Sequence, residues 1–120
     1  QVTLEAGGTA LAIRYTWSVD GQPQEGLMLL SGDPTSGKAV TAWSDSWHSS
    51  QTLLNSEGEI DATGRLRVIT TYGDDPAALW SWRTEVLGTA DSFEIRMYNI
   101  TDQGEEMLAV HSTYRRIAGA

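Results

Sequence analysis

The sequence predicts an all-β fold, an antiparallel meander of eight to nine strands that closes into a barrel. Turn signals built from Gly, Asp and Pro recur at close to the roughly 8–12-residue spacing of sandwiches and barrels. The segments between them are rich in Thr, Val, Ile, Tyr and Trp, which suit a pleated surface. No stretch holds a helical stripe, and connections this short favour antiparallel neighbours. Closure into a barrel would remove the exposed sheet edges.

The expected strands follow one another with little between them. Two-residue periodicity is clearest over 9–19, where Leu11, Ile13, Tyr15 and Trp17 alternate with small or polar residues. A short strand is expected at 2–6, and the segment Asp20 to Pro23 is expected to be a turn. Strands of the same kind are expected at 26–31, 38–47, 50–57, 65–72, 79–87, 93–100 and 106–116.

Length and composition narrow the class of protein. A chain of 120 residues is enough for one domain, 1–120, with one core. Five Trp and four Tyr against one Phe favour a surface that meets ligands, because these rings pair an apolar body with a polar tip. A net charge of −8 disfavours nucleic-acid and anionic-membrane partners. Without cysteine there is no disulfide or thiol nucleophile. The compartment is undecided, with the cytoplasm favoured, since no leader segment is recognisable.

The segment from Trp43 to His48 holds the most unusual chemistry. Alternation places Trp43, Asp45 and Trp47 on one face of a strand, so a carboxylate lies between two large rings. Asp45 and His48 are three residues apart and meet only if a bulge or turn follows Trp47. They either act in proton transfer or ligand anchoring, or Asp45 braces the chain entering the next turn. The bracing interpretation is favoured.

Two later strands carry charged residues opposite apolar ones. Trp80 and Trp82 share one face of 79–87, and Arg83 shares the other with Glu85. If the Trp face is the core, Arg83 and Glu85 form an exposed pair of little energetic value. If the Arg face points inward, they form a buried pair that orients a ligand. The first alternative is slightly favoured.

Further polar candidates lie near the C-terminus of the sequence. Arg96 and Tyr98 share a face of 93–100. His111 is expected in the middle of its strand, with Leu108 and Val110 together on the opposite face, and Glu106 is expected in a solvated turn. Two histidines without cysteine do not make a recognisable zinc site, so no metal and no cofactor is expected. Nucleophile-elbow, P-loop and dinucleotide motifs are absent.

Several motifs, in consistent order over residues 10–116, resemble those of the bacterial DUF1579 proteins. The resemblance rests on the segments 15–21, 42–48, 56–58, 80–85 and 97–106, and on the closing Tyr114-Arg115. It implies a lipocalin-like β-barrel and supplies no reaction, because the family's name marks its function as unknown. Such proteins usually begin with a further strand that carries a Gly-x-Trp-like motif, which residues 1–8 do not match. Either that strand is trimmed or the barrel closes without it.

These observations lead to the prediction of a barrel whose interior binds a small, mostly apolar or amphipathic molecule. Trp43, Trp47 and Trp82 would form walls near Asp45, while Arg96, Tyr98 and His111 would anchor a polar end. Two alternatives stay open: an enzyme of the cyclase or isomerase type using Asp45 or His48, and a packed structural or interaction module. A homodimer is compatible with each, if apolar residues face outward.

Overall fold

A computed structural model of the chain describes residues 1–47, 53–88 and 91–115, and it confirms the antiparallel all-β prediction. Over these residues, nine strands form one sheet, and the one helical element is a 3₁₀ turn, η1 (Ala6–Gly8). None of the helical structure in the described ranges is long and apolar enough to cross a membrane. The strands are β1 (Val2–Glu5), β2 (Ala10–Val19), β3 (Gln22–Asp33), β4 (Lys38–Asp45), β5 (Leu54–Ile60), β6 (Leu66–Tyr72), β7 (Trp80–Gly88), β8 (Ser92–Ile100) and β9 (Glu106–Arg115).

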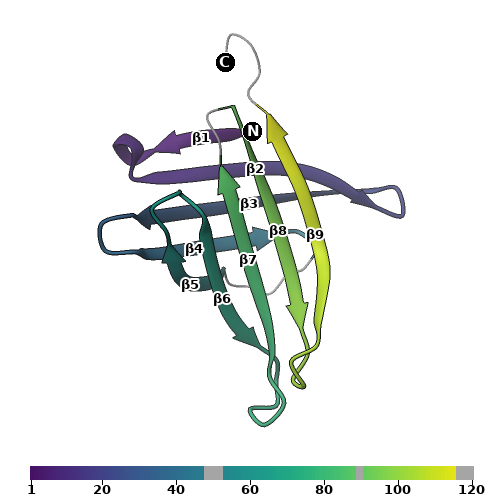
Figure 1. Cartoon of the computed structure of the whole chain (residues 1–120). Helices are drawn as coiled ribbons and strands as arrows, with labels where there is room; N and C mark the ends of the chain where they lie inside the picture. The colour runs from purple at the N-terminus through teal and green to yellow at the C-terminus, as the bar shows by residue number, and fades with distance from the viewer. Residues whose placement is uncertain (48–52, 89–90, 116–120) are drawn as a thin grey trace.

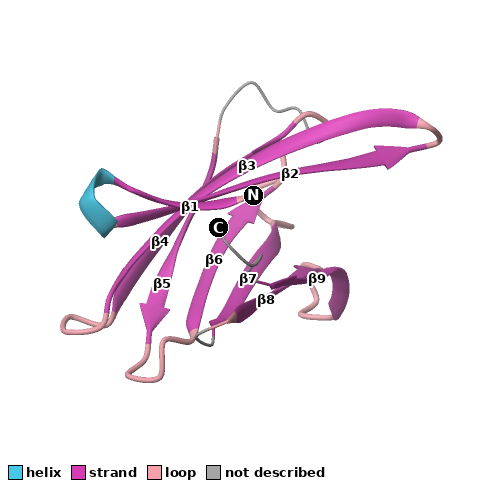
Figure 2. Ribbon diagram, turned by 90° about the horizontal axis from the view of Figure 1, so that it is seen from above, coloured by secondary structure: helices cyan, strands magenta, loops and turns pink. Residues whose placement is uncertain are grey.

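The sheet is a simple meander that curls into a half-barrel. Each strand pairs with the next one along the chain, and in the described ranges no ladder joins β1 to β9. Figure 1 shows β6 to β9 crossing in front of β2 to β4, and Figure 2 shows the same two groups as the wings of an open wedge. The meander is therefore as predicted, while the described part of the sheet keeps two free edges where closure was expected.

β3 is longer than its sequence pattern predicted, because the turn before it is very tight. Asp20 and Gly21 both have positive φ, at 49° and 76°, and they alone connect β2 to β3. A two-residue loop of this kind lets the strands resume pairing at once. Pro23 consequently lies within β3, opposite Ser18, where a turn was expected. β5 begins at Leu54, and the predicted strand residues 50–52 lie outside the described ranges.

The core lies on the inner, concave face of the half-barrel and is filled by side chains. The most deeply buried large side chains are Ile13, Met28, Val68 and Thr84. The register places Ile13 opposite Met28, and Val68 opposite Thr84. The rest of the core is likewise built from alternate residues of neighbouring strands, as the two-residue periodicity predicted.

A bulge in β9 changes which side chains face the core. Met97 is opposite Val110 and the next residue, Tyr98, is opposite Leu108, so Ala109 is extra. Val110 therefore packs against the core, while Leu108 faces outward and is 57% exposed. The prediction that these two residues share a face was wrong, because unbroken alternation takes no account of an inserted residue.

Candidate functional site

Asp45, the last residue of β4, is a buried carboxylate that accepts hydrogen bonds from three groups. It is 7% exposed. The Tyr15 hydroxyl donates to its Oδ2 at 2.6 Å, and the Trp17 Nε1–H donates to the same oxygen at 3.0 Å. Its Oδ1 accepts from the backbone N–H of Trp47 at 2.9 Å. Both carboxylate oxygens are thus satisfied despite their burial.

A glycine makes the contact between Tyr15 and Asp45 possible. Tyr15 is on β2 and Asp45 on β4, and Gly26 of β3 lies directly between them in the register. A Cβ at Gly26 would lie 2.1 Å from Cζ of the Tyr15 ring. The ring therefore lies flat across the bare backbone of β3, and its hydroxyl reaches the carboxylate two strands away.

The Tyr15 hydroxyl links two further side chains of the site. It donates to Asp45 and accepts from the Trp43 Nε1–H at 2.7 Å. Burial, followed by the hydrogen bond to Asp45, raises the pKa of Tyr15, so the phenol remains a proton donor. Asp45 here fixes aromatic rings and the backbone after β4, in accordance with the bracing interpretation. His48, its suggested partner, lies outside the described residues.

Ring contacts join four of the tryptophans in two pairs. Trp17 meets Trp47 edge to face, with ring centroids 5.7 Å apart. Trp43 stacks on Trp82 of β7 at 5.5 Å, so the curl of the sheet brings β4 and β7 together across the interior. Trp80 lies two residues before Trp82, on the same face. We call this set the aromatic end; it comprises Tyr15, Trp17, Trp43, Asp45, Trp47, Trp80 and Trp82.

One polar atom of the aromatic end has no partner. The indole Nε1 of Trp82 is buried, and no hydrogen-bond acceptor reaches it from the described parts of the chain. A buried donor left unsatisfied costs about 1–3 kcal/mol. Trp82 as a whole is only partly buried. An acceptor that reached its Nε1 by a small shift of the surrounding side chains would recover this cost.

Three of the predicted site residues lie on the other face of the sheet. Arg96 is opposite Glu85 on one side and His111 on the other, and Tyr98 is opposite Arg83. All of these point away from the core. The structure thus brings Trp43, Asp45, Trp47 and Trp82 together, and it separates them from Arg96, Tyr98 and His111.

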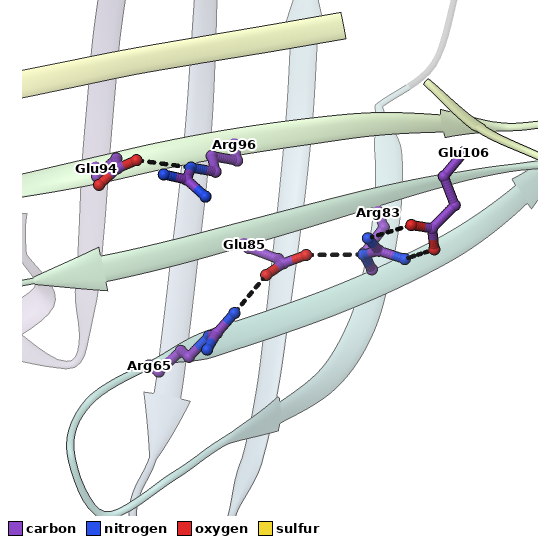
Figure 3. A network of polar contacts seen from close by, with 6 residues as sticks. All are labelled: Arg65, Arg83, Glu85, Glu94, Arg96 and Glu106. Atoms are coloured by element: carbon purple, nitrogen blue, oxygen red, sulfur yellow. Dashed lines mark hydrogen bonds and ion pairs between the residues drawn. The ribbon is translucent and has the colours of Figure 1, made fainter. Parts of the chain in front are cut away.

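The outer face of β6 to β9 carries a chain of ion pairs (Figure 3). Arg83 is its centre and is 7% exposed. Its Nε donates to Glu85 at 2.9 Å, its Nη2 donates to Glu106 at 3.2 Å, and its Cζ lies 4.5 Å from the centroid of the Tyr98 ring. Trp82 faces the core as favoured from the sequence, yet Arg83 is buried where an exposed pair was expected. Glu106, expected in a solvated turn, begins β9 and binds Arg83.

Hydrogen bonding to arginine sets the charge state of these acids. The bond from Arg83 holds the pKa of Glu106 below its usual value, and the bond to Glu106 raises the pKa of Arg83. A second group on this face joins Glu94 to Arg96 at 2.6 Å and to His111 at 2.7 Å, which lowers the pKa of Glu94. Within the ranges that the structure describes, no cluster of three or more acidic, His or Cys side chains is arranged to hold a metal.

Sequence reasoning missed two residues that fix the site, Tyr15 and Trp17. Alternation placed both on one face of β2. Their link to Asp45 passes over β3, and single-strand alternation does not report contacts between strands that are not direct neighbours in the sheet. The available signal was Gly26, a glycine inside a predicted strand, which often marks a close approach of another group.

Comparisons with known proteins agree with the resemblance seen in the motifs. A family model described as "Protein of unknown function (DUF1579)" matches residues 2–116. Comparison with curated proteins and with solved structures gave no match.

Proposed function

The chain belongs to the DUF1579 family, and from the geometry of its aromatic end we propose that it binds a small, mostly apolar molecule that carries one hydrogen-bond acceptor. The molecule would lie against the rings at the open end of the inner face. Its acceptor would take the hydrogen bond of the Trp82 indole.

The unpartnered Nε1 of Trp82 is the observation that carries this proposal. Ligand sites in proteins are mainly apolar and aromatic, with a few polar groups that set orientation. A buried donor in a wall of rings is such a group. It favours a carbonyl or ether oxygen over a second donor, because an indole N–H can only donate.

The rigidity of the aromatic end supports the same proposal. Asp45 and the Tyr15 hydroxyl fix three rings by hydrogen bonds. Rings held in place before binding lose little conformational freedom when a ligand arrives. Trp17, Trp80 and Trp82 remain partly exposed, and Trp47 is exposed, so apolar ring surface is available to a ligand.

The alternative of an enzyme that uses Asp45 has less support. A general base needs a lone pair directed at its substrate. Hydrogen bonds from Tyr15, Trp17 and the backbone of Trp47 already occupy both oxygens of Asp45. The sequence also suggested Arg96, Tyr98 and His111 as the anchor for a polar end of the ligand. Trp82 is favoured for this role, because those three residues lie on the outer face.

A titration followed by NMR tests the proposal directly. Acetophenone and ethylbenzene are similar in size and differ at the carbonyl. We expect acetophenone to bind about fivefold more tightly, from about 1 kcal/mol for the added hydrogen bond. The indole N–H resonance of Trp82 should move downfield with acetophenone, as a new hydrogen bond requires, and should not do so with ethylbenzene.

Two variants control this experiment. Trp82→Phe keeps an aromatic ring but removes the donor, so both probes should bind this variant equally. Tyr114→Phe removes a hydroxyl beside the stacked Phe93 but leaves the Trp82 indole unchanged, and should leave the preference for acetophenone intact. A packed module without a ligand site would bind neither probe, and that result would end the proposal.

A further inference from the structure

A groove lined by described residues lies on the outer face of the sheet, opposite the core. It crosses β3, β4, β5 and β6 and has a volume of about 690 Å³. The outward-facing side chains that line it include Leu29, Val40, Ala42, Glu57 and Ile69, with Ala10 of β2 at its border. Neither the aromatic end nor the ion pairs around Arg83 take part in it.

The floor of this groove is apolar and open to solvent. Leu29, Val40 and Ile69 are 40%, 53% and 46% exposed. Several exposed aliphatic side chains around one groove are unusual on a solvated sheet face and often mark a binding surface. The outer face elsewhere is different in character, since β6 to β9 present the charged side chains of Figure 3.

A single acid, Glu57, stands in this apolar surface. It is directly opposite Val40 on one side and Ile69 on the other. Three acids on the outer face of β7 to β9 differ from it, because Glu85, Glu94 and Glu106 bind arginines. Glu59 is opposite both Lys38 and Arg67. Across the described parts of the chain, no hydrogen bond or ion pair engages the Glu57 carboxylate.

The size of the groove favours a small molecule over a protein. Thirteen residues line it, whereas a stable protein interface uses roughly 20–30 residues on each side. Its volume of about 690 Å³ lies within the range of small-molecule sites, about 300–1,000 Å³.

We propose that this groove binds a small amphipathic amine, with its apolar body along Leu29, Val40 and Ile69 and its ammonium group at Glu57. The combination of an apolar floor with one unpaired carboxylate selects a cation that carries hydrocarbon. The site is independent of the aromatic end, on the opposite face of the sheet, so either proposal can fail without the other.

The test uses n-octylamine, 1-octanol and octanoate at pH 7, titrated into the ¹⁵N-labelled protein. We expect octylamine to shift the backbone amides of Leu29, Val40 and Ile69, with octanol weaker and octanoate weakest. Glu57→Gln should weaken octylamine binding about two- to fivefold, as for a solvent-exposed ion pair. The same substitution should leave octanol unaffected.

Glu59→Gln is the matched control, because it removes the same charge from the same face of β5, two residues away. It should bind octylamine as the wild type does. Equal weakening in both variants would show general attraction to an acidic protein and would overturn the proposal. Equal affinity for the three probes would overturn it too. Light scattering on the same samples tests whether a second copy of the chain occupies the groove. A dimer that buries these amides would assign the groove to that second copy and overturn the proposal.

Discussion

Replacing Gly26 by alanine should severely destabilise the protein. The new Cβ would lie 2.1 Å from Cζ and 2.2 Å from the hydroxyl oxygen of Tyr15. Ordinary contacts between such atoms are about 3.5–4.0 Å, so the ring must move by more than an ångström. It is not free to do so, since its hydroxyl is bonded to both Asp45 and Trp43.

The magnitude follows from two contributions. Overpacking a well-packed site costs about 1–3 kcal/mol. Breaking a hydrogen bond to a charged group costs about 1.5–3 kcal/mol more. Alanine is preferred to glycine within a strand, which returns about 0.5–1 kcal/mol. The expected loss in free energy of unfolding is therefore about 3 kcal/mol, or roughly 10–15 °C in Tm for a domain of this size.

Urea denaturation followed by circular dichroism measures this loss, and two further variants isolate its cause. Gly32→Ala meets the side chain of Ile60, whose Cδ1 lies 2.9 Å and Cγ2 3.2 Å from the new Cβ, and should cost less than about 1 kcal/mol because no hydrogen bond holds that side chain in place. In a Tyr15→Leu background the ring is gone, so adding Gly26→Ala should also cost less than about 1 kcal/mol. If the effects of Tyr15→Leu and Gly26→Ala simply add, the clash is not the cause and the reasoning is refuted.

Two further predictions concern the outer face. Arg83→Met should lower the free energy of unfolding by about 2 kcal/mol in a urea titration, because it removes charge-assisted hydrogen bonds from a buried group. Arg65→Met, which removes an exposed guanidinium, should cost less than about 0.5 kcal/mol, and equal losses would contradict the argument. The pKa values of Glu94 and Glu106 are lowered by folding, so their stabilisation is complete above the usual glutamate pKa of about 4.3. This stabilisation is lost as the pH falls through the lower pKa values that the two groups have in the folded protein. When the free energy of unfolding is measured as the pH is lowered, it should fall less steeply in Glu106→Gln than in the wild type. An unchanged slope would show that Arg83 does not lower the pKa of Glu106.

Local alternation was sufficient to predict most of the sheet. It placed Ile13, Tyr15 and Trp17 on one face, and it put Trp82 on the core side of β7. These inferences succeed because the side-chain period of a strand is two and one face of this sheet is buried. The expected pairing of neighbours also held, since loops this short leave little choice of partner.

Features that depend on curvature and on inserted residues were not predictable in this way. The stacking of Trp43 on Trp82 requires the sheet to curl, which no single strand encodes. On one side of the bulge at Ala109, the side chains of β9 face the opposite side of the sheet from the one that unbroken alternation predicts. Burial of Arg83 requires Tyr98 and Glu106 to close over it from β8 and β9. Each depends on contacts between residues far apart in the chain, which composition and periodicity do not report.

The gathering of the tryptophans has a consequence for spectroscopy. All five indoles of the chain lie at the aromatic end, on β2, β4 and β7 or directly after β4. The stacked pair Phe93 and Tyr114 joins β8 to β9 without any indole. Intrinsic tryptophan emission is therefore a local probe of one end of the half-barrel. Tyrosine signals and amide exchange would instead be the direct record of fraying of β9 around Tyr114.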